Sequence, residues 1–293
     1  MQLTNKYNLP EAVVTAIQDD NYSRGSSDIT VTQLIAPPRL VALSNRHKNE
    51  IVEDAADRFY MLFGKLIHEL LEKADPNALV ERLYMDVNGW RLGGLTDHIQ
   101  VNEGDASWII KDYKCTSYYT INPDFNNGNL YKEEWEQQLN IYAQLFRANG
   151  FDVSSLSIVA IFRDFSKFKS QQTSYLKAPI QEISIPLWSE EKCMAFIKKR
   201  IIMHQMSEHL ESAELPACTD KERWAKPTKY AVKVPYKDRA MILKNTAEDA
   251  STFIENNGDG SWWVEQRVGK SVRCDDYCNV NNFCSQYLVS KGI

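Results

Sequence analysis

The sequence predicts an α/β fold in which a mixed sheet is flanked by helices. Two observations carry this prediction. Short apolar or alternating segments bounded by turn residues are typical of strands, and they occupy residues 81–87, 90–101, 107–115 and 155–163. Longer segments have apolar residues at helical spacing, at residues 50–73, 133–149 and 189–212. A chain of 293 residues is long enough for one large domain or for one domain with appendages.

Composition excludes few classes of function. Hydrophobic residues make up 43% of the chain, as is ordinary for a soluble globular protein. The first residues lack a basic start followed by an apolar core, and no apolar stretch reaches bilayer length, so we expect a cytoplasmic protein without membrane contact. The net charge of −5 is not typical of a nucleic-acid-binding protein, but it allows a local basic groove.

The N-terminal third is predicted to be mainly helical. Residues 9–20 have helical composition, and Pro37 and Pro38 end a short element over residues 31–35. The helix over residues 50–73 contains Gly64, which costs about 1 kcal/mol relative to alanine and predicts a break or a close backbone approach. His68 follows on the same helix, where a lone histidine is more often a packing or surface residue than a ligand.

The strands at residues 81–87, 90–101 and 107–115 are predicted to form a three-stranded antiparallel meander. Asn88 and Gly89 supply the first turn. Gly93 and Gly94 weaken the second strand and indicate a bulge or room for a substrate backbone.

Two acidic residues and a lysine lie on neighbouring strands of this meander. Successive side chains alternate faces, so Asp112 and Lys114 point one way while Tyr113 and Cys115 point the other. Charges at this spacing are also common on solvated edge strands. Together with Asp97, however, they resemble a Mg²⁺ site, in which carboxylates hold the ion and a lysine offsets charge on a phosphate.

The helix over residues 133–149 places Gln138 and Tyr142 one turn apart on the same side. Such a pair is usually half-buried packing, unless an active site is adjacent. After the next strand, residues 163–169 interleave basic and aromatic side chains, which suits either a groove that tracks a nucleic-acid strand or a solvated loop.

The order of these elements resembles the RecB-like branch of the PD-(D/E)XK nuclease superfamily. That branch includes phage-type exonucleases and the iron–sulfur nucleases of CRISPR adaptation and of the AddB subunit. The motifs, in chain order, are G-x-x-x-H, G-G-x-x-D, D-x-K and Q-x-x-x-Y, and they end at His68, Asp97, Lys114 and Tyr142.

The resemblance implies a restriction-endonuclease-like core and assigns a role to each motif residue. His68, Asp97, Asp112 and the main-chain carbonyl of Tyr113 would hold Mg²⁺ or Mn²⁺, and Lys114 would be catalytic. Gln138 and Tyr142 would support the catalytic site or the DNA. Asp112 stands where many relatives have Glu.

Six cysteines without a secretion signal argue against a disulfide framework and for a metal or cluster site. Cys274, Cys278 and Cys284 are closely spaced, and Cys218 is the candidate for a fourth ligand. A set of four cysteines suits zinc or an iron–sulfur cluster. The resemblance implies a [4Fe–4S] cluster, although the spacing of Cys274 and Cys278 is one residue wider than in most relatives. Cys115 and Cys193 are expected to be a core residue and a helix residue.

Two regions follow from these assignments. Residues 1–215 would hold the helical N-terminal region and the nuclease core, and residues 216–293 a cysteine-clamped small α/β module with the iron–sulfur region. The module is predicted to have strands at residues 229–234, 239–243 and 262–267 and a helix at residues 246–256.

The leading hypothesis is a metal-dependent DNA exonuclease that acts on single strands or duplex ends in phage or bacterial recombination or repair. An oligomer or a recombination partner protein is compatible with it. One alternative is a module with a nuclease-like fold that only binds DNA ends or a partner, and another is an endonuclease of the same superfamily.

Overall fold

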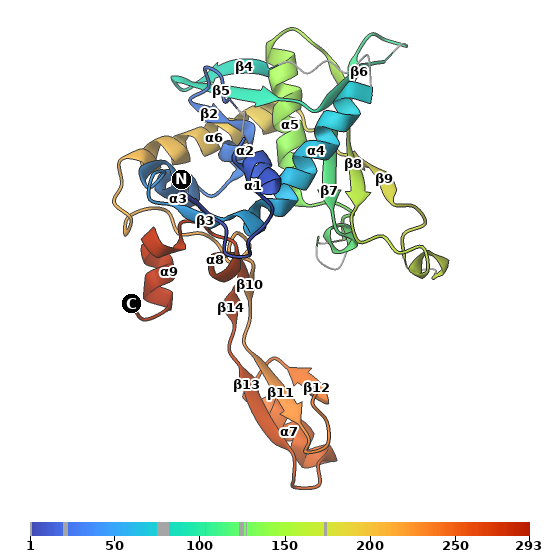
Figure 1. Ribbon diagram of the computed structural model, residues 1–293, viewed down its shortest axis with the longest axis vertical. Coiled ribbons are helices and arrows are strands. Elements are labelled where there is room, and N and C mark those ends of the chain that lie inside the picture. Colours follow the sequence, from blue (N-terminus) through green and yellow to red (C-terminus); the bar gives the residue numbers. More distant parts are fainter. Residues whose placement is uncertain are drawn as a thin grey trace. The chain divides into compact units, whose positions relative to one another are not determined.

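A computed structural model describes the chain except residues 1, 20–22, 75–81, 103, 123–125, 127 and 173–174. The chain divides into two compact units, Met1–Leu210 and Glu211–Ile293 (Figure 1). No helix within the described ranges is long and apolar enough to cross a membrane.

A mixed four-stranded sheet forms the centre of the first unit. Its strands lie in the order β6 (His98–Val101), β7 (Trp108–Thr116), β8 (Val153–Phe162) and β9 (Ile180–Ile185). β7 and β8 are parallel, and both outer pairs are antiparallel. Ile110, Ile158 and Ala160 on the central strands are fully buried. The predicted α/β class and mixed sheet are therefore confirmed.

Helix α5 (Glu133–Ala148) makes the crossover between β7 and β8 and is the most buried helix of this unit (Figure 1). It contacts both central strands and helices α2 (Val31–Ile35) and α6 (Glu190–Glu208). A parallel strand pair needs a crossover connection of this kind, because a tight hairpin turn can join only antiparallel strands. Glu133 and Glu134 in its first turn complement the helix dipole.

A second sheet contains β4 (Arg82–Val87) and β5 (Trp90–Leu95), so the predicted three-stranded meander is wrong. Its order is β2 (Ile29–Thr30), β5 and β4. The strand expected over residues 90–101 divides at Thr96 and Asp97, so β5 belongs to this sheet and β6 to the central one. The two hairpins exist, but the continuous three-stranded meander does not. Position 81, where the first strand was predicted to start, lies outside the described residues.

The helix expected over residues 50–73 also differs. Strand β3 (Val52–Asp54) pairs with β1 (Gln2–Thr4), and a 3-10 turn (Ala55–Arg58) precedes helix α4 (Phe59–Ala74). Buried Asp54 ends the strand because its side chain accepts a hydrogen bond from the Ala56 amide. No residue of α4 is buried, so its apolar stripe is not the core that its periodicity predicted. Helices α1 (Glu11–Gln18) and α3 (Pro38–Arg46) complete this region.

The glycines have different roles from those expected. A β-carbon at Gly94 would lie 2.7 Å from both Tyr142 and Leu145 of α5, so Gly94 gives room to that helix rather than to a substrate. A β-carbon at Gly64 would meet nothing within 4 Å, and α4 continues through this position. The predicted break or close approach at Gly64 is therefore wrong.

The second unit contains the predicted α/β elements. Strands β12 (Ile242–Lys244), β11 (Lys229–Lys233) and β13 (Trp263–Arg267) form one antiparallel sheet, which helix α7 (Ala247–Asn257) contacts. The strand expected at residues 239–243 begins later, at Ile242. Strands β10 (Ala225–Lys226) and β14 (Lys270–Ser271) form a separate two-stranded antiparallel sheet. Helices α8 (Val272–Asp276) and α9 (Ser285–Ser290) follow in the chain.

Gly94→Ala should destabilise the protein by about 1–3 kcal/mol, because the new methyl group overpacks the contact between β5 and α5. Gly64→Ala is the matched control and should stabilise α4 by about 1 kcal/mol, because the site is open and alanine favours helices. Urea unfolding of both variants measures this difference. A Gly94→Ala protein as stable as wild type would contradict the packing described here.

Stability should also fall in mild acid because of His204 on α6. Burial lowers the pKa of this imidazole to about 4, Arg200 lowers it further, and a hydrogen bond to the Leu34 carbonyl only partly opposes both. Between the unfolded value near 6.5 and about 4, the unfolded chain binds a proton that the folded chain does not, so stability decreases as pH falls, by roughly 3 kcal/mol in total. His204→Gln keeps a donor for Leu34 but does not titrate. Urea unfolding at pH 7.5 and pH 5 should therefore show a smaller loss in the variant, and equal losses would rule out His204 as the cause.

Candidate active site

Four elements of the first unit bring the motif residues together. The register of β6 and β7 pairs His98 with Lys111, which sets Asp97, just before β6, across from Asp112. Asp112 and Lys114 lie on β7, and Gln138 and Tyr142 lie on α5. His68 comes from α4, which contacts β7. Residues from 68 to 142 in the sequence thus converge at one place.

Asp112 and Lys114 form a buried ion pair at the centre of this group. Asp112 is 2% exposed, and Lys114 Nζ lies 2.6 Å from its Oδ2. This ion pair is the contact of Oδ2, which has no other partner among the described residues. Lys114 Nζ also donates to Gln138 Oε1 at 3.1 Å. The lysine is therefore held by two groups and aimed at the carboxylate.

Gln138 joins α5 to both members of the pair. Its Nε2 donates to Asp112 Oδ1 at 3.3 Å and to the Tyr142 hydroxyl at 3.2 Å, while its Oε1 accepts from Lys114. Gln138 and Tyr142 are 8% and 6% exposed. Gln138 therefore contacts both members of the ion pair, and Tyr142 is linked to the pair through Gln138.

Asp97 is held by both of its carboxylate oxygens. Oδ2 accepts from the Tyr113 amide at 3.1 Å, and Oδ1 lies 3.1 Å from His68 Nδ1. The break between β5 and β6 permits this geometry, because a residue within a regular strand would project away from the neighbouring backbone. The Tyr113 amide was not foreseen, because a main-chain donor has no signal in a sequence.

The electrostatics follow from burial and from these neighbours. Burial raises the pKa of Asp112 to about 7, although the Lys114 charge opposes the shift. Burial disfavours the charged form of Lys114, but Asp112 and Asp97 outweigh it and raise the pKa of this ammonium. Burial likewise opposes protonation of His68, and the hydrogen bond and charge of Asp97 reverse that effect and raise its pKa. The lysine consequently stays charged at neutral pH.

The donor set fits a hard divalent cation. Carboxylate and carbonyl oxygens are the ligands that Mg²⁺ prefers, and Asp112 Oδ2 is a buried carboxylate oxygen whose contact is the Lys114 ammonium. Within the described residues, no group of three or more His, Cys, Asp or Glu side chains is arranged to hold a metal ion. In this geometry His68 and Lys114 instead occupy one oxygen of each acid.

Sequence reasoning also missed Tyr60. The Arg163 guanidinium lies over its ring, 4.0 Å from the centroid, so the first residue of the basic and aromatic run contacts α4. Phe168, later in that run, is 79% exposed. The pairing joins positions about a hundred residues apart, which no local pattern reveals.

The C-terminal cysteines lie in the second unit. Burial raises the pKa of the Cys274 and Cys278 thiols. The charge of Cys284 raises both pKa values further, and the charge of Cys278 also raises that of Cys274. The Gln286 side chain bonds the main-chain amide and carbonyl of Cys218, both at 2.9 Å, and so ties this residue to the same region. Cys193, in the first unit, is fully buried, and its Sγ is directed at the Asn140 carbonyl.

Comparison with known proteins gives a family model and several solved structures. The family model of the PD-(D/E)XK nuclease superfamily matches residues 31–285. The solved structure described as "Crystal structure of SSO0001" is 21% identical, with a TM-score of 0.44, and the match covers 66% of this chain and 85% of that one. No curated protein matches this chain. Because the family model spans most of the sequence, this chain belongs to the PD-(D/E)XK nuclease superfamily.

Proposed function

We propose that this protein is a metal-dependent exonuclease that hydrolyses the phosphodiester bonds of DNA from a single strand or a duplex end. The observation that carries the proposal is the convergence of Asp97, Asp112 and Lys114 at one place beside His68. We propose that the protein acts in the cytoplasm, in phage or bacterial recombination or repair. It would act there as an oligomer or with a partner protein.

Each residue would have a defined task. Asp97, Asp112, His68 and the Tyr113 carbonyl would hold Mg²⁺ or Mn²⁺, which neutralises charge on the phosphate and acidifies a bound water. Lys114 keeps its proton and faces the carboxylates, so it would donate to a phosphate oxygen as negative charge develops there. Gln138 would keep Lys114 from turning away, and Tyr142 would hold Gln138 in that orientation.

A module that only binds DNA ends or a partner is the contrasting proposal. It is disfavoured because a buried carboxylate and lysine cost free energy through desolvation, and a purely structural fold would gain as much from an apolar pair. An endonuclease of the same superfamily would use the same residues.

The four C-terminal cysteines would hold a [4Fe–4S] cluster, with zinc as the alternative. Two observations support a metal here, the tether between Cys218 and Gln286 and a small core, although in this geometry the described cysteine side chains form no group of three that could hold an ion. The buried apolar residues of this unit are Leu215, Ala231, Val232, Val234, Ala250, Val280 and Cys284. A unit with so few buried side chains gains from a metal staple.

Lys114→Met should lower kcat for cutting end-labelled DNA by about 10²–10³-fold, because the positive charge on the phosphate is lost. Asp112→Asn should abolish cutting with either Mg²⁺ or Mn²⁺, and DNA binding in EDTA should persist in both variants. Lys111→Met is the matched control, because Lys111 lies on the opposite face of β7 and pairs with Glu182 at 3.1 Å. Wild-type cutting by Lys114→Met would refute the assignment, and cutting of closed single-stranded circles would favour the endonuclease.

Protein purified without oxygen should contain iron and labile sulfide and absorb visible light if the cysteines hold a cluster. Cys284→Ser should lose this metal, whereas Cys193→Ser should keep it because Cys193 packs in the core of the other unit. Zinc without iron would identify the alternative ligand. Wild-type protein with neither metal would contradict the proposed site.

A further inference from the structure

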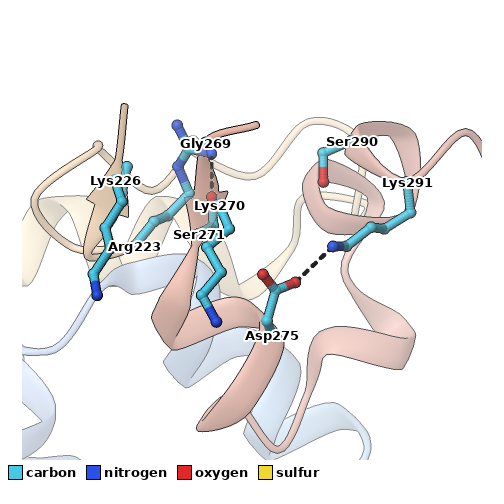
Figure 2. Close-up of a pocket in the computed structure, with 9 residues that line it drawn as sticks. Arg223, Lys226, Gly269, Lys270, Ser271, Asp275, Ser290 and Lys291 are labelled. Carbon is cyan, nitrogen blue, oxygen red and sulfur yellow. Dashed lines mark hydrogen bonds and ion pairs between the residues drawn. The ribbon is translucent and has the colours of Figure 1, made fainter. Parts of the chain in front are cut away.

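A pocket of about 290 Å³ in the second unit is surrounded by cationic side chains (Figure 2). Arg223, Lys226, Lys270 and Lys291 line it, and they come from three separate segments of the chain. Asp275 is the acidic side chain among its lining residues. Every residue of this unit is described, so no undescribed segment of the unit fills the space.

The lysines are placed where the fold alone would disfavour them. In the two-stranded ladder of β10 and β14, Lys226 lies directly across from Lys270. Like charges at opposed positions of an antiparallel pair destabilise it, and a ladder of two residues on each strand has few other contacts. An anion between the two lysines would remove this repulsion.

Three of the four cations have acidic partners: Arg223 pairs with Asp220, Lys291 with Asp275 and Lys270 with Asp276. Lys270 pairs with Asp276 at 3.2 Å, and both side chains are about half exposed. Such a surface pair is worth about 0–1 kcal/mol, so a phosphate can replace it at little cost. No described carboxylate forms an ion pair with Lys226. Lys226 therefore supplies the pocket with a positive charge that no described carboxylate pairs with. Lys270 supplies a second, whose pair with Asp276 can be exchanged at little cost.

Arg223 and Lys291, which also line the pocket, make polar contacts with other lining residues. Arg223 donates a hydrogen bond of 2.9 Å to the Ser271 hydroxyl, and Lys291 Nζ lies 2.7 Å from Asp275 Oδ1; Figure 2 marks both contacts. Arg223 Nε is buried without a hydrogen-bond partner among the described residues. Guanidinium, ammonium and hydroxyl groups are the donors that phosphate oxygens recruit.

We propose that this pocket binds the phosphodiester backbone of the nucleic-acid strand, a proposal that rests on the proposed nuclease function. The residues that line it include no aromatic side chain, so a base would find no aromatic ring to stack on. Cations without base contacts recognise the backbone independently of sequence. The pocket would give the protein a second point of attachment to its substrate.

The test uses the double variant Lys226→Gln, Lys270→Gln of the full chain, with Lys237→Gln, in the connection between β11 and β12 of the same unit, as control. Anisotropy of a labelled oligonucleotide in EDTA measures binding without cutting. Affinity at low salt should fall on the order of tenfold, and the slope of log K against log salt should decrease by about 1.4 for single strands or 1.8 for duplex. The control should match wild type.

Two further readouts separate the outcomes. Thermal stability of the double variant should be unchanged or higher, because a repulsion is removed; a lower stability with unchanged affinity would assign the lysines a structural role and overturn the proposal. Calorimetry with inorganic phosphate distinguishes the source of the anion. Tight phosphate binding that the variant loses, with oligonucleotide binding intact, would assign the pocket to free phosphate instead. Loss of cutting in Asp112→Asn tests the nuclease function separately, because it does not involve this pocket.

Discussion

The burial of Asp112 beside Lys114 is the constraint on which the first unit depends. Removing a carboxylate from water costs several kcal/mol, and the ion pair offsets this only if its remaining atoms are satisfied. Gln138 meets that requirement by bonding both partners, so the pair needs α5 at a fixed distance from β7. Core packing of α5 sets that distance, and Gly94 permits it by leaving room for Tyr142.

The break between β5 and β6 links this chemistry to the topology. A continuous strand over residues 90–101 would have kept Asp97 in a regular ladder. The chain instead changes sheet there, and Asp97 turns to bond the Tyr113 amide and His68. The two sheets therefore meet at the proposed metal ligands, and α4 approaches without burying a side chain. The helix that carries His68 thus has the fewest packing constraints around the site.

The second unit is organised by charge and by cysteine rather than by a large core. Its buried apolar set is small, and its shortest ladder holds two opposed lysines. Such a unit is stabilised by what it binds, since a ligand of the native state adds to its free energy of unfolding. A metal at the cysteines and a phosphate at the lysines would act in the same direction on neighbouring segments.

The sequence by itself determined the fold class, the two hairpins, α5 and the motif residues, because apolar periodicity, turn residues and motif order are local signals. Prediction from the sequence misplaced the start of α4, joined β5 to β6 and overestimated the burial of α4, because periodicity does not reveal what a helix face packs against. Only the tertiary structure decided that Asp97 bonds the Tyr113 amide, that Tyr60 lies under Arg163 and that Lys226 opposes Lys270. Each of these contacts joins residues far apart in the chain, where register and sheet order, not local pattern, determine which atoms meet.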